Sequence, residues 1–253
     1  NTESACSEAI GYFDFMLKVA RKYNKYGMQR DAHQLLSQCY LIRNEHHLAL
    51  MHAKIFDDMS RDNELQRIVS LQQLGRVHLE FGEFDAATET WKILLDQCNQ
   101  SKRTEPQVPQ RHRIRQHVRK ESRKLMNPCT HLASTYCFLG KTHFLAGDYY
   151  AALEDFRSQL KFAHNELCII VAELNIAFTL RSLGEPQQLK SALALYNKYL
   201  SWSMAEKTRD NFHTKDPGNR VLTSMETHAR FCLSEIHTAL GETSTALVNQ
   251  KKR

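Results

Sequence analysis

A pattern of small residues recurs along this chain and constrains its fold more than any single residue does. In five places a small residue is followed, about twelve positions later, by an alanine. Paired helices that repeat in this way cannot each bury an apolar face alone, so they stack on their neighbours. The pattern therefore predicts an all-α solenoid. The small residues are Ser37, Gly75, Gly140, Ala177 and Ser234, and the alanines are Ala49, Ala87, Ala152, Ala192 and Ala246.

The distances between the small residues define the repeat length. Two of them are 38 and 37 residues, whereas the other two are 65 and 57 residues. Subtracting a period of about 37 leaves excesses of roughly 28 and 20, which coincide with polar, proline-containing stretches at 101–128 and 203–220. We therefore expect a single solenoid over 1–253 with two inserts between repeats. A half-repeat with the same pattern precedes the first copy at Ala9, Phe13 and Met16.

Glycine marks the turn inside most of the expected helix pairs. Gly82, Gly147, Gly184 and Gly241 fall where a first helix must end, and Asn44 takes that place in the first copy. Both residue types accept a left-handed backbone. We also expect each small residue of the pattern to lie where the two helices of a pair cross, since a larger side chain would hold the backbones apart.

The second and third copies carry the fullest version of the pattern. The second contains Leu71, Leu74, Gly75, Ala87 and Trp91, and the third contains Tyr136, Leu139, Gly140, Tyr149, Ala152 and Phe156. These residues resemble the tetratricopeptide repeat (TPR) family, and the resemblance covers nearly all of the chain outside the inserts. It implies a right-handed TPR solenoid of about five helix-turn-helix repeats with a half-repeat at the N-terminus. It also implies a scaffold for a partner protein, which the fold alone does not identify.

The long repeat and the run 75–91 point to particular groups within the TPR family. The run reads GRVHLEFGEFDAATETW and looks most like the TPR subunit of the outer dynein arm docking complex. The preceding run 64–67 resembles tonsoku, a scaffold of replication repair, and the LGN spindle-orientation adaptor and kinesin light chain share the long repeat. The first resemblance implies a ciliary dynein-docking or motor-adaptor component in the cytoplasm or axoneme. The second implies a nuclear scaffold in replication-coupled DNA repair.

In TPR proteins, set positions of each first helix line a concave groove, and the resemblance transfers these positions to this chain. Arg76, Lys141 and Arg181 would make the groove basic beside apolar patches, which suits a peptide or helix with apolar anchors and acidic neighbours. Arg76 and Lys141 stand where a chaperone-binding clamp has asparagine, so a chaperone cofactor is disfavoured. The alternative is a groove filled by the chain itself, with solvated charges. The expected lining residues are Gln34, Gln38, Leu41, Gln72, Arg76, Leu79, Cys137, Lys141, Phe144, Leu174, Phe178 and Arg181.

The insert 101–128 concentrates the positive charge. It holds nine basic residues against two acidic ones, a net +7, which leaves −1 for the rest of a chain whose total is +6. Such a segment could bind nucleic acid, an acidic protein tail such as that of tubulin, or anionic lipid, or it could stay a solvated loop. It has no aromatic residue for base stacking and no apolar face for membrane insertion. Its central basic residues are Arg111, Arg113, Arg115, Arg119, Lys120, Arg123 and Lys124.

The sequence lacks motifs for catalysis, metals or cofactors. Thirteen histidines form no His-Glu-x-x-His motif, and seven cysteines form no Cys-x-x-Cys pair. His46, His47 and His52 share one expected helix on diverging faces, and Asp57 and Asp58 are expected on a helix surface. We therefore expect a non-enzymatic protein of a reducing compartment, with no cofactor and no membrane span.

Overall fold

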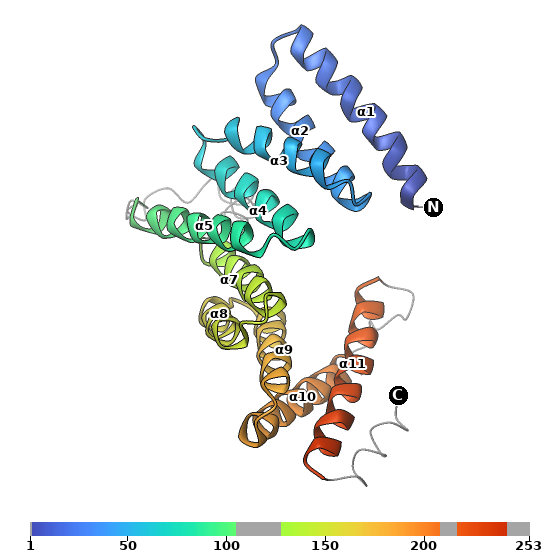
Figure 1. The fold of residues 1–253 in the computed structure, drawn as a ribbon, viewed down its shortest axis with the longest axis vertical. Coiled ribbons are helices and arrows are strands. Elements are labelled where there is room, and N and C mark those ends of the chain that lie inside the picture. The colour runs from blue at the N-terminus through green and yellow to red at the C-terminus, as the bar shows by residue number, and fades with distance from the viewer. Residues whose placement is uncertain (1, 105–127, 208–216, 242–253) are drawn as a thin grey trace, which may run out of the picture. The chain divides into compact units, whose positions relative to one another are not determined.

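The structure, a computed structural model, describes residues 2–104, 128–207 and 217–241. Within these ranges the chain forms ten α-helices and no strand, which confirms the all-α prediction (Figure 1). The first five are α1 (Thr2–Lys22), α2 (Tyr26–Ile42), α3 (His46–Asp58), α4 (Glu64–Glu80) and α5 (Phe84–Thr104). The others are α7 (Pro128–Leu145), α8 (Tyr149–Phe162), α9 (Glu166–Leu183), α10 (Pro186–Lys207) and α11 (Pro217–Ala239).

The chain divides into two compact units, Asn1–Ala146 and Gly147–Arg253, called unit 1 and unit 2 below. In unit 1, α2 packs between α1 and α3, α4 packs between α3 and α5, and α5 packs against α7. The helices α2, α4 and α7 also contact one another in that order. In unit 2, α9 packs between α8 and α10, and α11 packs against α10. Each unit is therefore a stack of consecutive helices.

The turns between helices agree with the sequence signals. Asn44 follows α2 with φ 59°, and Gly82 follows α4 with φ 74°, so both have the left-handed backbone that ends a helix. Asn24, between α1 and α2, has the same conformation at φ 51°, although the sequence analysis assigned it no role. The remaining turn glycines with positive φ are Gly147, Gly184 and Gly241.

The small residue Gly75 makes room for a tryptophan ring. A Cβ at Gly75 would lie 2.7 Å from the Trp91 indole, so the absence of a side chain at Gly75 leaves room for this ring. Trp91 is fully buried, stacks on Phe138 with ring centroids 5.2 Å apart, and donates through Nε1 to Thr142 Oγ1 at 3.1 Å. One indole therefore joins α4, α5 and α7.

Ser37 has a different contact at the equivalent place in the first copy. Its Oγ donates to the Ala49 carbonyl oxygen at 3.0 Å, which ties α2 to α3. The pattern alanines Ala49, Ala87, Ala152 and Ala192 are all fully buried. The fifth, Ala246, lies outside the described residues.

The two expected inserts are described only in part. α5 continues to Thr104 and α7 begins at Pro128, so the basic residues 111–124 lie outside the described ranges. The range 203–220 begins in α10, where Ser203 is fully buried, and ends in α11. None of the helices in the described ranges is long and apolar enough to cross a membrane.

Candidate partner-binding surface

The helices α2, α4 and α7 of unit 1 form the row on which the sequence places part of the groove. Gln73 on α4 donates through Nε2 to Ser37 Oγ on α2 at 3.1 Å. Gln72, also on α4, donates through Nε2 to Ser134 Oγ on α7 at 3.4 Å. Amide–hydroxyl hydrogen bonds therefore tie each helix of the row to the next.

Two cations on this row are available to a ligand. Arg76 is exposed on α4 and forms no ion pair within the described part of the chain. Lys141 is exposed on α7, and its Nζ lies 5.5 Å from the centroid of the Phe138 ring, a cation–π contact. It too has no carboxylate partner among the described residues. Because neither charge is neutralised, both can attract an acidic side chain.

The other predicted groove residues of unit 1 reach the surface to different degrees. Leu79 is only 7% exposed, so its assignment to the groove is corrected. It lies four positions after Gly75 and shares the helix face that packs inward on Trp91. The half-buried residues are Gln34, Gln38, Leu41, Gln72, Cys137 and Phe144.

The predicted groove residues of unit 2 lie on α9, and two of them, Phe178 and Arg181, contact α11. Arg181 forms an ion pair with Glu235, and the two side chains are 22% and 47% exposed. The Arg181 guanidinium also lies 4.9 Å from the Phe178 ring centroid, and that ring faces His228 at 5.8 Å. Leu174 is half-buried on the same helix. The third predicted groove cation is therefore neutralised inside its own unit.

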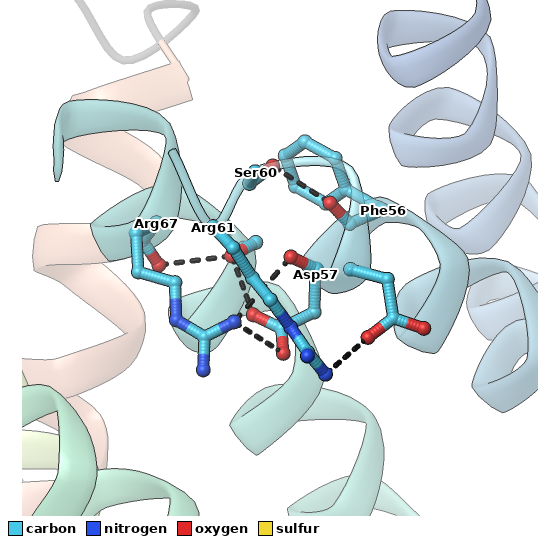
Figure 2. A network of polar contacts seen from close by, with 7 residues as sticks. Phe56, Asp57, Ser60, Arg61 and Arg67 are labelled. Atoms are coloured by element: carbon cyan, nitrogen blue, oxygen red, sulfur yellow. Dashed lines mark hydrogen bonds and ion pairs between the residues drawn. The ribbon is translucent and has the colours of Figure 1, made fainter. Parts of the chain in front are cut away.

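A buried carboxylate joins the first repeat of unit 1 to the second. Asp57 is 8% exposed at the end of α3, which corrects its expected surface position. Figure 2 shows Arg67 pointing toward it, with Nη1 of Arg67 2.7 Å from Asp57 Oδ2. Ser70 Oγ donates to Asp57 Oδ1 at 2.7 Å. Asp58 remains exposed and pairs with Arg61. The Asp57 network therefore fastens α3 to α4.

Two histidines form a buried pair inside the first repeat. The Nδ1 atoms of His33 and His52 are 2.8 Å apart, and the residues are 3% and 7% exposed. One ring must donate and the other accept, so the pair forms only while at least one ring is neutral. Burial, with His52 and Arg21 nearby, lowers the pKa of His33 to about 4. Burial also lowers the pKa of His52.

Two more histidines flank a carboxylate at the turn between α4 and α5. His78 Nδ1 hydrogen-bonds Glu83 Oε2, and His46 Nε2 lies 3.2 Å from Glu83 Oε1. The hydrogen bond from His78 holds the pKa of Glu83 below its ordinary value. His46 also packs on Phe81 with ring centroids 4.3 Å apart. These contacts link α3 to the next repeat, and no group of three metal-ligating side chains occurs among the residues described.

Comparison with known proteins shows likeness in structure but not in sequence. No protein-family model matches the chain, and no curated protein sequence matches it. Crystal structures of BtubC from P. vanneervenii and of apo RapI superpose with TM-scores of 0.69 and 0.62 at 12% and 14% identity. The BtubC match covers 98% of this chain and 89% of BtubC, and the RapI match covers 93% of this chain and 57% of RapI.

A third similar structure contains nearly identical TPR-like repeats and is named after a kinesin light chain of Podosopora anserina. It superposes with a TM-score of 0.60 at 13% identity, over 88% of this chain and 92% of that one. Identities this low establish the fold and no shared activity. The stacked helix pairs and these likenesses together show that the chain has the fold of a TPR-like helical-repeat protein.

Proposed function

We propose that this chain is a non-enzymatic scaffold that holds a segment of a partner protein on the row α2–α4–α7. The observation that carries the proposal is the pair Arg76 and Lys141, two exposed cations on neighbouring helices that have no carboxylate partner among the described residues. Half-buried amide and apolar side chains surround them on the same row. Such a surface suits a helix or extended peptide that combines apolar anchors with acidic residues.

The spacing of the helices indicates how the acidic residues of the partner are arranged. Packed helices lie about 8–10 Å apart, and Arg76 and Lys141 are on neighbouring helices. An extended segment covers that distance in about three residues, at roughly 3.3 Å per residue. A helix lying across the row needs about six residues, at roughly 1.5 Å per residue. We therefore expect two acidic residues at one of these spacings, next to an apolar residue.

A peptide library displayed on phage tests the groove directly. Peptides selected on the wild-type chain should be acidic and apolar, and Arg76→Glu with Lys141→Glu should raise their dissociation constants about a hundredfold, since each lost contact is replaced by repulsion. The matched control is Lys92→Glu with Lys161→Glu, which reverses two exposed charges on α5 and α8. Equal binding by the groove variant and the control would contradict the proposal.

The cellular role is the finer part of the proposal. The run 75–91 supports a ciliary dynein-docking or motor-adaptor component, and the run 64–67 supports a nuclear scaffold of replication repair as the second candidate. The basic insert would then contact an acidic tail, tubulin in the first case, or nucleic acid in the second. Fractionation of cells from the source organism separates them: the first candidate pellets with microtubules or axonemal doublets, and the second pellets with chromatin at low salt.

A further inference from the structure

The segment that joins α1 to α2 is rich in basic and aromatic residues. It reads RKYNKY over 21–26 and covers the end of α1, the turn and the first residue of α2 (Figure 1). It contains three basic residues and no acidic one, a net charge of +3. The nearest acidic residues along the chain are Asp14 and Asp31, and Asp31 already pairs with Arg30. This segment, here called the basic turn, therefore carries a positive charge that no neighbour in the sequence balances.

The exposure of this turn does not depend on where the chain begins. Residues 23–27 are all exposed, and so are residues 61–65, which hold the same place 38 positions later, between α3 and α4. The later turn has packed helices on both sides, because α3 packs on α2 and α4 packs on α5. Turn residues at this edge of the stack thus face solvent even where another repeat precedes them.

The two turns differ in their chemistry. The segment 59–64 reads MSRDNE, which has a net charge of −1 and no aromatic residue. In the basic turn, Tyr23 and Tyr26 are each 61% exposed. Lys22 Nζ lies 5.6 Å from the centroid of the Tyr23 ring, a cation–π contact. None of the three basic side chains forms an ion pair within the described ranges, so all three charges can attract an anion.

Hydrogen bonds fix the backbone of the basic turn. The backbone N–H of Lys25 donates to the Ala20 carbonyl oxygen at 2.8 Å. Gln29 Nε2 donates to the same oxygen at 3.2 Å, so α2 is tied to the last turn of α1. Asn24 takes the left-handed conformation between them, at φ 51°. A surface that is ordered before binding loses less conformational entropy when a ligand arrives.

Exposed aromatic rings beside unpaired cations are the groups that bind single-stranded nucleic acid. Cations follow the phosphates, and bases stack on the rings without regard to sequence. Tyr23 and Tyr26 are three positions apart, so their Cα atoms are at most about 11 Å from each other. The bases of one short strand can therefore reach both rings. A lipid surface would call for an apolar face that enters the bilayer, and these rings end in hydroxyl groups.

We propose that the basic turn binds single-stranded nucleic acid. Unpaired bases stack on its two tyrosine rings, and its cations hold the phosphates on either side. The contact is sequence-tolerant, with a dissociation constant on the order of 1–100 micromolar. The stacking residues are Tyr23 and Tyr26, and the phosphate-binding residues are Arg21, Lys22 and Lys25.

This site is distinct from the other two basic regions of the chain. The insert 101–128 has a larger positive charge but no aromatic residue, so it can attract a strand and cannot stack its bases. The peptide surface proposed above uses Arg76 on α4 and Lys141 on α7. A chain that binds an oligonucleotide and no acidic peptide would separate the two proposals.

Fluorescence anisotropy of a labelled oligonucleotide of about 12 nucleotides and mixed sequence, titrated with the full chain at low salt, tests the stacking. Tyr23→Ala with Tyr26→Ala should raise the dissociation constant about a hundredfold, since each lost stack costs about tenfold. The fold should be unaffected, because both rings face solvent. The matched control is Tyr150→Ala, also 61% exposed, which should bind as the wild type does. The tyrosine variant should bind a duplex of the same sequence as the wild type does, because paired bases cannot stack on the rings.

The salt dependence tests the phosphate contacts. Lys22→Gln with Lys25→Gln should reduce the slope of log affinity against log salt by about 1.4, since each phosphate contact of a single strand contributes roughly 0.7. Lys92→Gln with Lys161→Gln, which removes two exposed charges on α5 and α8, should leave the slope unchanged.

Three results would overturn the proposal. The first is no binding of the oligonucleotide at low salt. The second is binding that the tyrosine variant does not weaken, which would assign the contact to the basic insert. The third is binding to vesicles that contain phosphatidylserine but not to the oligonucleotide, which would make the basic turn a lipid-binding surface.

Discussion

The predicted groove cations have no carboxylate partner among the described residues of unit 1, whereas the one in unit 2 has such a partner. In unit 1, Arg76 and Lys141 are exposed and have no carboxylate partner among the residues described. In unit 2, Arg181 is paired with Glu235 and lies over Phe178. Arg76 and Lys141 are therefore exposed to solvent, whereas Arg181 links α9 to α11 through Glu235.

The difference depends on the distance of each cation from the small residue of its repeat. Arg76 and Lys141 come one position after Gly75 and Gly140, whereas Arg181 comes four positions after Ala177. A residue four positions on shares the face of the small residue, which is packed inward, and a residue one position on is turned away from it. The position relative to the small residue thus decides whether a basic side chain is exposed or packed against its own unit.

The largest loss of folding stability is expected at Gly75, where the inward face of α4 packs tightly on the Trp91 ring. Gly75→Leu should reduce the free energy of unfolding by about 3 kcal/mol, because even a Cβ would lie 2.7 Å from the Trp91 ring. Chemical denaturation of the purified variant measures this loss. The matched control is Gly11→Ala on α1, where no atom lies within 4 Å of the new Cβ. This control should gain about 0.5–1 kcal/mol from helix propensity. Equal stability of Gly75→Leu and wild type would contradict the assignment of Gly75 to the inward-packed face of α4.

Acid should weaken unit 1 through its buried histidine pair. The pKa of His33 is about 4 when folded, against an ordinary value of 6.5. Between these values the unfolded chain binds a proton that the folded chain does not, so unfolding becomes easier as the pH falls. We expect a loss of about 3 kcal/mol on acidification through this window, on the scale of roughly 1.4 kcal/mol per pKa unit.

Hydrogen exchange detected by mass spectrometry locates the acid effect. Amides of α2 and α3 should exchange faster as the pH falls through the window, after correction for intrinsic exchange rates. His33→Leu combined with His52→Leu removes both titrating groups and should flatten the pH dependence of stability. A wild-type dependence that survives in this double variant would assign the acid effect to other groups.

The smallest stability changes are expected for the cations themselves, and they compare the paired Arg181 with the exposed Arg76. A double-mutant cycle on Arg181 and Glu235 should give a coupling of about 0.5–1 kcal/mol, since both side chains are partly exposed. Arg76→Ala should change the free energy of unfolding by less than about 0.5 kcal/mol, because the exposed side chain has no ion-pair partner in the described ranges. Thermal denaturation of the wild type and the four variants measures both. A coupling of zero would mean that the ion pair between Arg181 and Glu235 adds nothing to the free energy of unfolding.

Local spacing in the sequence predicted much of the architecture. Asn44 and Gly82 identify turns because the backbone conformation they allow is a property of the residue itself. The spacing of the small residues and alanines predicted the helix pairs, because this spacing follows from helix geometry. The burial of the alanines agrees with that prediction. The groove positions that follow from the repeat pattern stay predictions for the half-buried residues and were wrong for Leu79.

Contacts between distant residues could not be predicted in this way. Glu235 closes on Arg181 from 54 positions away, and the pairing requires α11 to return beside α9. Asp57 is buried because Arg67 reaches it from the following helix. His33 and His52 meet across two helices at a separation of 19 positions. In each case the sequence shows the residue type, and only the packing of neighbouring helices shows its partner.

The enclosure of Trp91 has a practical consequence for studying the two units. The chain has two tryptophans, and the second, Trp202, is half-buried on α10 of unit 2, its indole N–H without a hydrogen-bond partner in the described ranges. Each unit thus contains its own fluorophore, and Trp91→Phe or Trp202→Phe leaves a single optical reporter in place. Coincident unfolding curves from the two variants would make the chain one cooperative body, and separate curves would make it two.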